Sequence, residues 1–320
     1  MKNVSVLATG IVLLTLGWLG TAAAGAAGPV PGSKLLAELA WGRGPGQTGF
    51  FNHTSPGFEE SAAMGPLGLA RLQAGELVVA DTWNDRLLVF DGKGQVERTV
   101  GLPELRRPAL LAPVSQGGVL VGLFESQRVL RLNSGWEVLR AFGGRGEQEG
   151  QFLQLTALQS LLGGRAACGD LGANQVRVAD SQGRTVASLD WEGTGLAVDP
   201  SGRLVDLAYS DEAGYSVRDR ALDGAGQTLV PIAGRNLEGG KLLGADGKGG
   251  WWVRFTRADR PGVLSVRHLD AGGRELGTAL ELPHLVSDAT VFVQRDGRLL
   301  WLEYDAAAAP AGTVRIWQTE

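Results

Sequence analysis

The sequence predicts an all-β protein, a β-propeller of six four-stranded antiparallel blades, from three observations. Glycine followed by a hydrophobic strand recurs about every 44 residues, at Gly75, Gly118, Gly164, Gly202, Gly250 and Gly297. A second strand follows each of these after a polar turn, and several strands alternate apolar and polar residues. Helical periodicity is nearly absent beyond the first 27 residues. One such unit cannot bury both faces of its sheet, so the units must stack around an axis.

Length and composition set the limits of this prediction. The 320 residues would suggest two domains, but the repeat uses nearly all of residues 28–320 and indicates one domain. With 30 basic against 34 acidic residues the net charge is −4, which argues against a nucleic-acid partner. A hydrophobic content of 44% excludes a disordered or coiled-coil chain.

The N-terminus has the features of a secretory signal peptide, which we expect to span residues 1–27. Lys2 precedes a mostly apolar run from Val4 to Gly20, and small residues follow, with cleavage after Ala24 or Ala27 equally compatible. An uncleaved membrane anchor is the alternative. No later segment is long and apolar enough to span a bilayer, so we expect a periplasmic or extracellular protein.

Cys168 is the only cysteine in the chain. It cannot form an internal disulfide or contribute to a thiolate zinc site. It falls in a predicted strand, where we expect a buried, inert thiol.

The repeat also predicts how the ring closes. The blades are expected near residues 66–100, 108–142, 155–190, 195–230, 241–281 and 285–317. The sixth unit ends too early for an outer strand, and the segment 34–41 is otherwise unassigned. We therefore expect 34–41 to supply that strand and to close the ring. Rings of five or seven blades remain alternatives because the fourth unit is short.

Residues 78–94 resemble the core of an NHL repeat, in which a hydrophobic strand is followed by Ala-Asp-Thr-x-Asn-x-Arg, a second strand and Asp-x-x-Gly. Residues 142–152 and 41–47 look like the linkers between such repeats. The resemblance implies a propeller for the whole chain. It implies the family's loop for the first blade only, because the third to sixth blades lose the motif. That loop contains Asp81, Thr82, Asn84 and Arg86.

The first blade also contains the best candidate for a contact surface. Within its loop, Asp81 and Asn84 are expected to fix the turn and Arg86 to bridge to it. Trp83 has no such structural need, so it is either an interface anchor or a side chain packed on the neighbouring linker. The insertion 51–64 should project on the same face. The predicted contact patch comprises Trp83, Phe51, His53 and Phe58.

Acidic residues open or occupy five of the loops between second and third strands. They could form a rim that attracts a cation or a basic partner, or each could cap its own turn. Turn chemistry alone favours the capping role. The five residues are Asp81, Glu125, Asp170, Asp211 and Glu303.

These observations favour a monomeric, non-catalytic module that binds another protein or an extracytoplasmic ligand. The alternative is a periplasmic hydrolase or lyase, resembling propeller lactonases or amidating lyases, with a metal in the central channel and His284 beside it. The chain has only three histidines and no hydrolase or phosphate-loop motif. No cofactor is therefore expected, and calcium or zinc has no support from the sequence.

Overall fold

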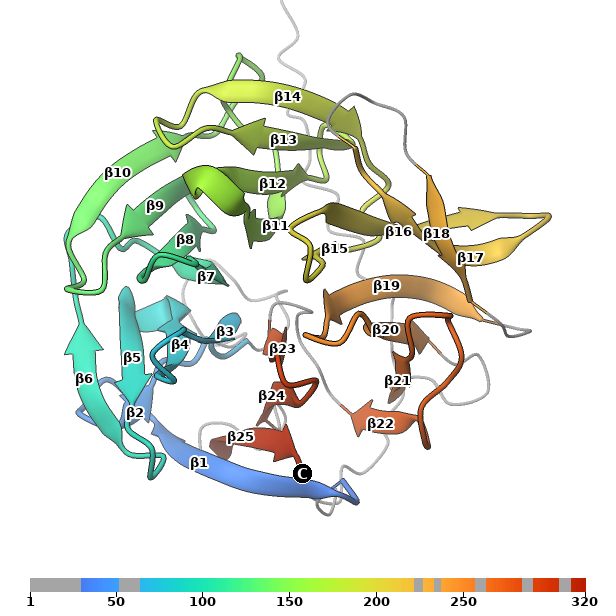
Figure 1. Ribbon diagram of the computed structural model, residues 1–320. Helices are drawn as coiled ribbons and strands as arrows, with labels where there is room; N and C mark the ends of the chain where they lie inside the picture. The colour runs from blue at the N-terminus through green and yellow to red at the C-terminus, as the bar shows by residue number, and fades with distance from the viewer. Residues whose placement is uncertain are drawn as a thin grey trace, which may run out of the picture.

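A computed structural model describes residues 30–51, 64–221, 227–232, 237–256, 263–283, 290–304 and 312–320. These residues form six antiparallel sheets arranged as blades around a central channel (Figure 1). The predicted fold class is confirmed: the protein is an all-β, six-bladed propeller. Two short 3-10 turns, η1 (Thr82–Asn84) and η2 (Leu162–Gly164), interrupt the strands.

Within the first five blades the strands run in chain order from the channel outward, because each strand is joined to the next by a hairpin connection. The first blade consists of β3 (Gly68–Arg71), β4 (Leu77–Asp81), β5 (Arg86–Phe90) and β6 (Val96–Val100). The second consists of β7 (Pro108–Pro113), β8 (Val119–Leu123), β9 (Arg128–Leu132) and β10 (Val138–Gly143). The third consists of β11 (Leu155–Ser160), β12 (Ala166–Asp170), β13 (Gln175–Ala179) and β14 (Thr185–Asp190). The fourth and fifth consist of β15 (Leu196–Val198), β16 (Leu204–Ser210), β17 (Gly214–Asp219) and β18 (Thr228–Pro231); β19 (Glu238–Ala245), β20 (Trp251–Thr256), β21 (Val263–Leu269) and β22 (Leu280–Pro283).

The sixth blade contains both ends of the described chain. It consists of β23 (Val291–Val293), β24 (Leu299–Tyr304), β25 (Thr313–Thr319) and β1 (Ser33–Trp41), with β2 (Gln47–Thr48) added in parallel. β1 pairs antiparallel with β25 along its whole length, from Ser33 opposite Thr319 to Ala40 opposite Thr313. The N-terminal strand therefore closes the ring, as the sequence predicted.

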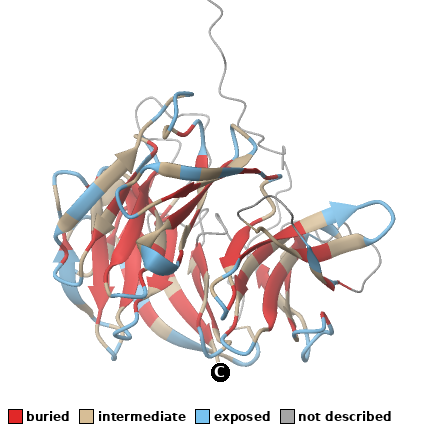
Figure 2. Ribbon diagram, turned by 45° about the horizontal axis from the view of Figure 1, so that its top comes forward, coloured by how far each residue is buried: buried red, intermediate tan, exposed pale blue. Residues whose placement is uncertain are grey.

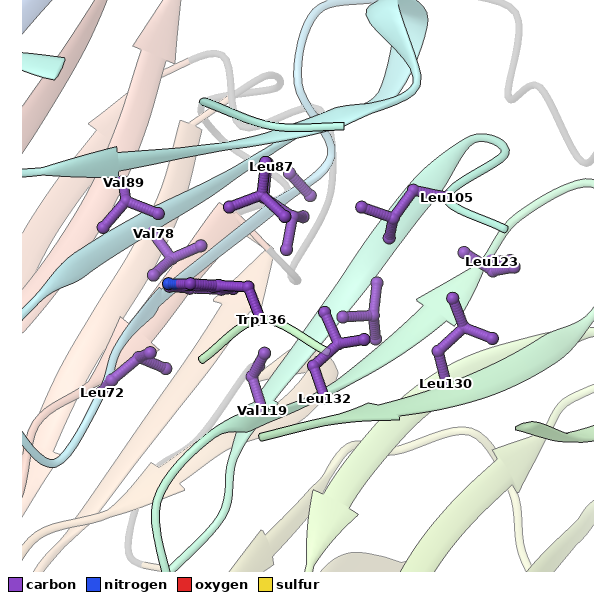
Figure 3. Close-up of a cluster of buried hydrophobic side chains, with 13 residues drawn as sticks. Leu72, Val78, Leu87, Val89, Leu105, Val119, Leu123, Leu130, Leu132 and Trp136 are labelled. Carbon is purple, nitrogen blue, oxygen red and sulfur yellow. The ribbon is translucent and has the colours of Figure 1, made fainter. Parts of the chain in front are cut away.

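The alternation of side chains along each strand supplies the core between blades. In β4, Val78 and Ala80 face the second blade, whereas Leu77 and Val79 face the sixth. Val78 and Ala80 belong to a buried hydrophobic cluster between the first and second blades, which also contains Trp136 and is shown in Figure 3. Six such clusters lie at the six junctions between neighbouring blades. Stacking thus buries both faces of every sheet, which a single blade could not achieve.

The bulkiest side chains follow the same rule. Trp251 joins the cluster between the fourth and fifth blades, and its neighbour Trp252 joins the one between the fifth and sixth, together with Trp301. Cys168 is fully buried, and burial raises the pKa of its thiol to about 12. The expected buried thiol is therefore confirmed. Figure 2 shows the distribution of burial over the described residues, with buried strands inside the blades and exposed turns at the edge.

The hairpins place the loops on two faces of the ring. We call the face with the loops between second and third strands, together with the blade-to-blade linkers, the linker face. We call the opposite face, with the turns between first and second strands, the turn face. Asp residues begin several of the turns between third and fourth strands: Asp91 Oδ1, for example, accepts the backbone N–H groups of Lys93 and Gln95. These bonds hold the pKa of Asp91 below its usual value.

Candidate functional site

On the linker face, the loop of the first blade is organised around the buried carboxylate of Asp81. Oδ1 accepts hydrogen bonds from Thr48 Oγ1 at 3.0 Å and from the Gly49 N–H at 2.6 Å. Oδ2 accepts from Asn84 Nδ2 at 2.9 Å and from Arg86 Nε at 2.7 Å. The carboxylate therefore joins its own turn to the preceding linker.

Arg86 continues this network into the linker. Its guanidinium donates to the carbonyl oxygens of Arg43, Gly44 and Gln47, while Asn84 Nδ2 donates to the Gly42 carbonyl. A guanidinium presents several N–H donors in one plane, which suits a curved loop with carbonyls on its inner side. The loop is thus a clamp on the linker at residues 42–47.

Thr82 links the same loop to the second blade. Its hydroxyl donates to the Pro108 carbonyl at 2.7 Å and accepts from the Leu67 N–H at 3.1 Å. The hydroxyl is fully buried, so both bonds replace solvent contacts. All four residues of the family-like loop are therefore engaged within the fold.

Trp83 and Phe51 stack on each other, with ring centroids 4.5 Å apart and planes inclined by 20°. Trp83 Nε1 donates to the Gly65 carbonyl at 2.9 Å, and the Arg107 guanidinium lies 4.5 Å from the centre of its ring. Phe51 is only 5% exposed. Phe51 therefore supports Trp83 from below and is itself closed to a partner.

The other two residues of the predicted contact patch, His53 and Phe58, lie outside the described residues, as does most of the insertion. The predicted channel residue His284 and the predicted signal peptide, residues 1–27, also lie outside them.

The five predicted rim acids divide into two groups. Asp170 is buried like Asp81, and it accepts the N–H groups of Leu153 and Gln154 at 3.1 and 2.8 Å. Glu125 and Asp211 are exposed, and Glu303 is half-buried. Asp81 and Asp170 thus each accept hydrogen bonds from the linker that precedes their blade. In the described part of the chain, no three acidic, histidine or cysteine side chains gather closely enough to hold a metal ion.

A cavity of about 1110 Å³ occupies the channel and reaches the turn face. The inner strands of all six blades line it: β3, β7, β11, β15, β19 and β23. Its lining mixes leucine and valine side chains with hydroxyl, amide and charged groups. The volume of this cavity exceeds the ~300–1,000 Å³ of most small-molecule pockets.

The acids along this cavity are Asp199, Asp246 and Asp296, and each is held by its own blade. Asp199 accepts from the Ser201 hydroxyl at 2.7 Å and from Arg203 Nε at 2.8 Å. Burial alone would raise its pKa, but these bonds hold the pKa below the usual range. The bond from Arg298 likewise lowers the pKa of Asp296. Both carboxylates remain ionised and paired.

Asp246 forms a second kind of pair. Its Oδ1 accepts the N–H groups of Lys248 and Gly250, both at 2.7 Å, and its Oδ2 lies 2.8 Å from His268 Nε2. The imidazole stacks on Trp252, with centroids 4.4 Å apart and planes inclined by 4°. Burial opposes ionisation of Asp246, but the bonds from His268 and from the Gly250 and Lys248 N–H groups together lower its pKa.

Basic side chains outnumber acids along the cavity, in contrast to the protein's net charge of −4. The lining includes Lys34, Arg71, Lys241, Arg295 and Arg298. The sequence alone does not single out these residues, because an arginine next to a turn is ordinary surface chemistry. The sequence does contain one signal for two of them. Arg71 ends the inner strand of the first blade, and Arg298 follows the turn after the inner strand of the sixth.

Comparison with known proteins is consistent with this architecture. No protein-family model matches the chain, and no curated protein matches it. Solved structures do match. A streptogramin B lyase is 10% identical, covers 78% of this chain and 92% of its own, and gives a TM-score of 0.51. A catalytically inactive virginiamycin B lyase from Staphylococcus aureus, with quinupristin, is 10% identical, covers 89% and 98%, and gives 0.53.

A proposed gluconolactonase is 14% identical, covers 89% of this chain and 91% of its own, and gives a TM-score of 0.52. At these identities the likeness concerns the fold. The chain shares the propeller architecture. Among the described residues, no helix has the length and apolar character needed to cross a membrane.

Proposed function

We propose that the protein is an exported propeller of the NHL-repeat type that binds a ligand in its channel and releases it unchanged. The observation that carries this proposal is the cavity of about 1110 Å³, lined by the inner strands of all six blades. Its site lies toward the turn face, opposite the loop of Trp83. The first-blade loop supports the NHL assignment, because the residues that match the motif act together as a clamp on the linker.

The state of the ionisable groups favours binding over catalysis. A general base needs a basic atom directed at its substrate. Asp199, Asp246 and Asp296 instead direct their carboxylates at their own turns or at Arg203, His268 and Arg298. Their contribution is therefore to keep the cavity's walls in place. The ligand would contact the remaining hydroxyl, amide and basic groups.

One observation favours a second function, a hydrolase or lyase. Asp246 lines the cavity and is bonded to His268, and an imidazole oriented by a carboxylate is a common general base. This alternative predicts that a captured molecule is converted to product and that His268→Ala abolishes the conversion. It also allows a metal in the channel, which metal analysis of the purified protein would detect.

A channel-blocking variant tests the proposed function. Ser160, at the end of β11, is half-buried in the cavity wall, so Ser160→Trp should place a bulky indole in the channel and narrow it. Glu125→Trp, exposed on the linker face, adds the same side chain away from it. Each immobilised protein is exposed to an extracellular extract of the native host, and retained molecules are identified by mass spectrometry. The wild type and Glu125→Trp should retain the same unmodified molecule, and Ser160→Trp should lose it. Equal retention by Ser160→Trp would contradict the proposal.

A further inference from the structure

We propose that the cavity contains an oxyanion site between the sixth and first blades, built from Arg71, Arg298, Lys34 and the side-chain amides of Gln294 and Gln318. This inference rests on the proposed function, since it names the chemistry of the ligand that enters the channel. All five residues line the cavity. They come from β3, the β23–β24 turn, β1 and β25, which the closure of the ring brings together.

The first support is an excess of positive charge in a partly buried place. Arg71 and Arg298 are close enough that the charge of Arg298, added to the effect of burial, lowers the pKa of Arg71. The charge of one carboxylate, that of Asp296, acts on both guanidinium groups. Asp296 accepts a hydrogen bond from Arg298 Nε at 2.8 Å. Two guanidinium groups with one carboxylate leave a net positive charge, which a bound anion would neutralise.

The second support is a set of donors without acceptors. Arg71 uses one N–H on the Gly75 carbonyl at 2.8 Å, and its Nε is buried with no acceptor among the described residues. In the same part of the chain, Nε2 of Gln294 and Nε2 of Gln318 are also buried without an acceptor, in side chains only 5% and 3% exposed. Unsatisfied buried donors are uncommon because each loses its bonds to water. A ligand oxygen at this wall would satisfy them.

The third support is the position of Lys34. It lies directly opposite Gln318 in the pairing of β1 with β25, so both side chains project from the same end of the sixth blade. Lys34 is exposed and makes no ion pair with a described residue. It adds an exposed cation to the two planar guanidinium groups in the cavity lining. That set of donors fits a carboxylate or a phosphate monoester, which accept several charge-assisted hydrogen bonds.

Titration of the full chain with three related sugars tests this site. Gluconate carries a carboxylate, glucose 6-phosphate carries a phosphate, and glucose carries neither. Binding is measured by calorimetry and by the rise in melting temperature. We expect at least one anion to bind and glucose to fail. Adding salt should weaken the binding, and the better anion identifies which oxyanion the site prefers.

Variants locate the binding. Arg71→Gln and Arg298→Gln should each weaken anion binding about tenfold or more, because each removes a charge-assisted contact. Arg184→Gln is the matched control, since Arg184 pairs with Asp180 on an exposed turn away from the cavity. Melting temperatures show whether each variant is folded. If Arg71→Gln does not fold, the comparison of Arg298→Gln with Arg184→Gln decides.

The outcomes separate this inference from the proposed function. The oxyanion site is wrong if neither anion binds at millimolar concentration, or if Arg184→Gln weakens binding as much as the two cavity variants. If the host molecule is still retained by the wild type and lost in Ser160→Trp, the channel binds a ligand of other chemistry. If Ser160→Trp also leaves retention unchanged, the proposed function fails as well.

Discussion

Buried carboxylates in this protein hold loops, and Asp81 is the clearest case. Its two oxygens accept four hydrogen bonds from a linker, a turn and the guanidinium of Arg86. Asp170 has the equivalent position at the end of β12 and accepts two backbone N–H groups there. In these two blades, a single buried side chain therefore ties the loop to the linker before it. The same acids would have little freedom to attract a cation.

Asp81→Ala should destabilise the protein by about 3 kcal/mol or more, because it leaves a nearly buried Arg86 without its partner. Urea unfolding of the two proteins measures the difference. Arg184→Ala removes an ion pair whose arginine is 78% exposed, and it should change stability by less than about 1 kcal/mol. A loss for Asp81→Ala no larger than that of the control would show that the clamp does not stabilise the fold.

At the scale of elements, β1 determines whether the ring is closed. It lies at the N-terminal end of the described chain, yet it pairs along its length with β25 at the C-terminal end. Its inward side chains, Ala37 and Leu39, enter the cluster between the sixth and first blades. β1 also places Lys34 beside Gln318. Closure and the proposed oxyanion site thus depend on the same strand.

Two leucines of β1 test its contribution. Leu39 is 3% exposed, so Leu39→Ala should cost about 2–5 kcal/mol through lost burial and a residual cavity. Leu35 is 46% exposed, so Leu35→Ala should change stability by no more than about 0.5 kcal/mol. Thermal and urea unfolding compare them. Equal, small losses for both leucines would mean that β1 does not pack against the ring in solution.

At the scale of the whole molecule, the sequence predicted the architecture better than the site. The period of the repeat and the alternation within strands such as β4 predicted the stacked blades, because both follow from backbone geometry. The unassigned segment 34–41 and the missing outer strand predicted the closure by the same logic. The Asp81–Arg86 pair was also predictable, since it lies within one hairpin.

The cavity site could not be predicted in this way. Arg71 and Arg298 belong to distant parts of the chain, and only the closed ring brings them to one wall. Whether Gln294 and Gln318 find acceptors depends on side-chain packing, which has no counterpart in a repeat pattern. Trp83 is a similar case. Its loop position left open an interface anchor or a side chain packed on the neighbouring linker, and only the tertiary structure shows its contacts with Phe51, Gly65 and Arg107.

The proposed ligand site lies in the channel toward the turn face, and site-specific photo-crosslinking tests that placement most directly. A photoreactive benzoylphenylalanine is placed at Ser115, an exposed residue of the β7–β8 turn in the cavity lining, or at Glu125 on the linker face. Each protein is irradiated in host extract, and its mass is measured. We predict an adduct at Ser115 and none at Glu125. An adduct at Glu125 alone would contradict the account.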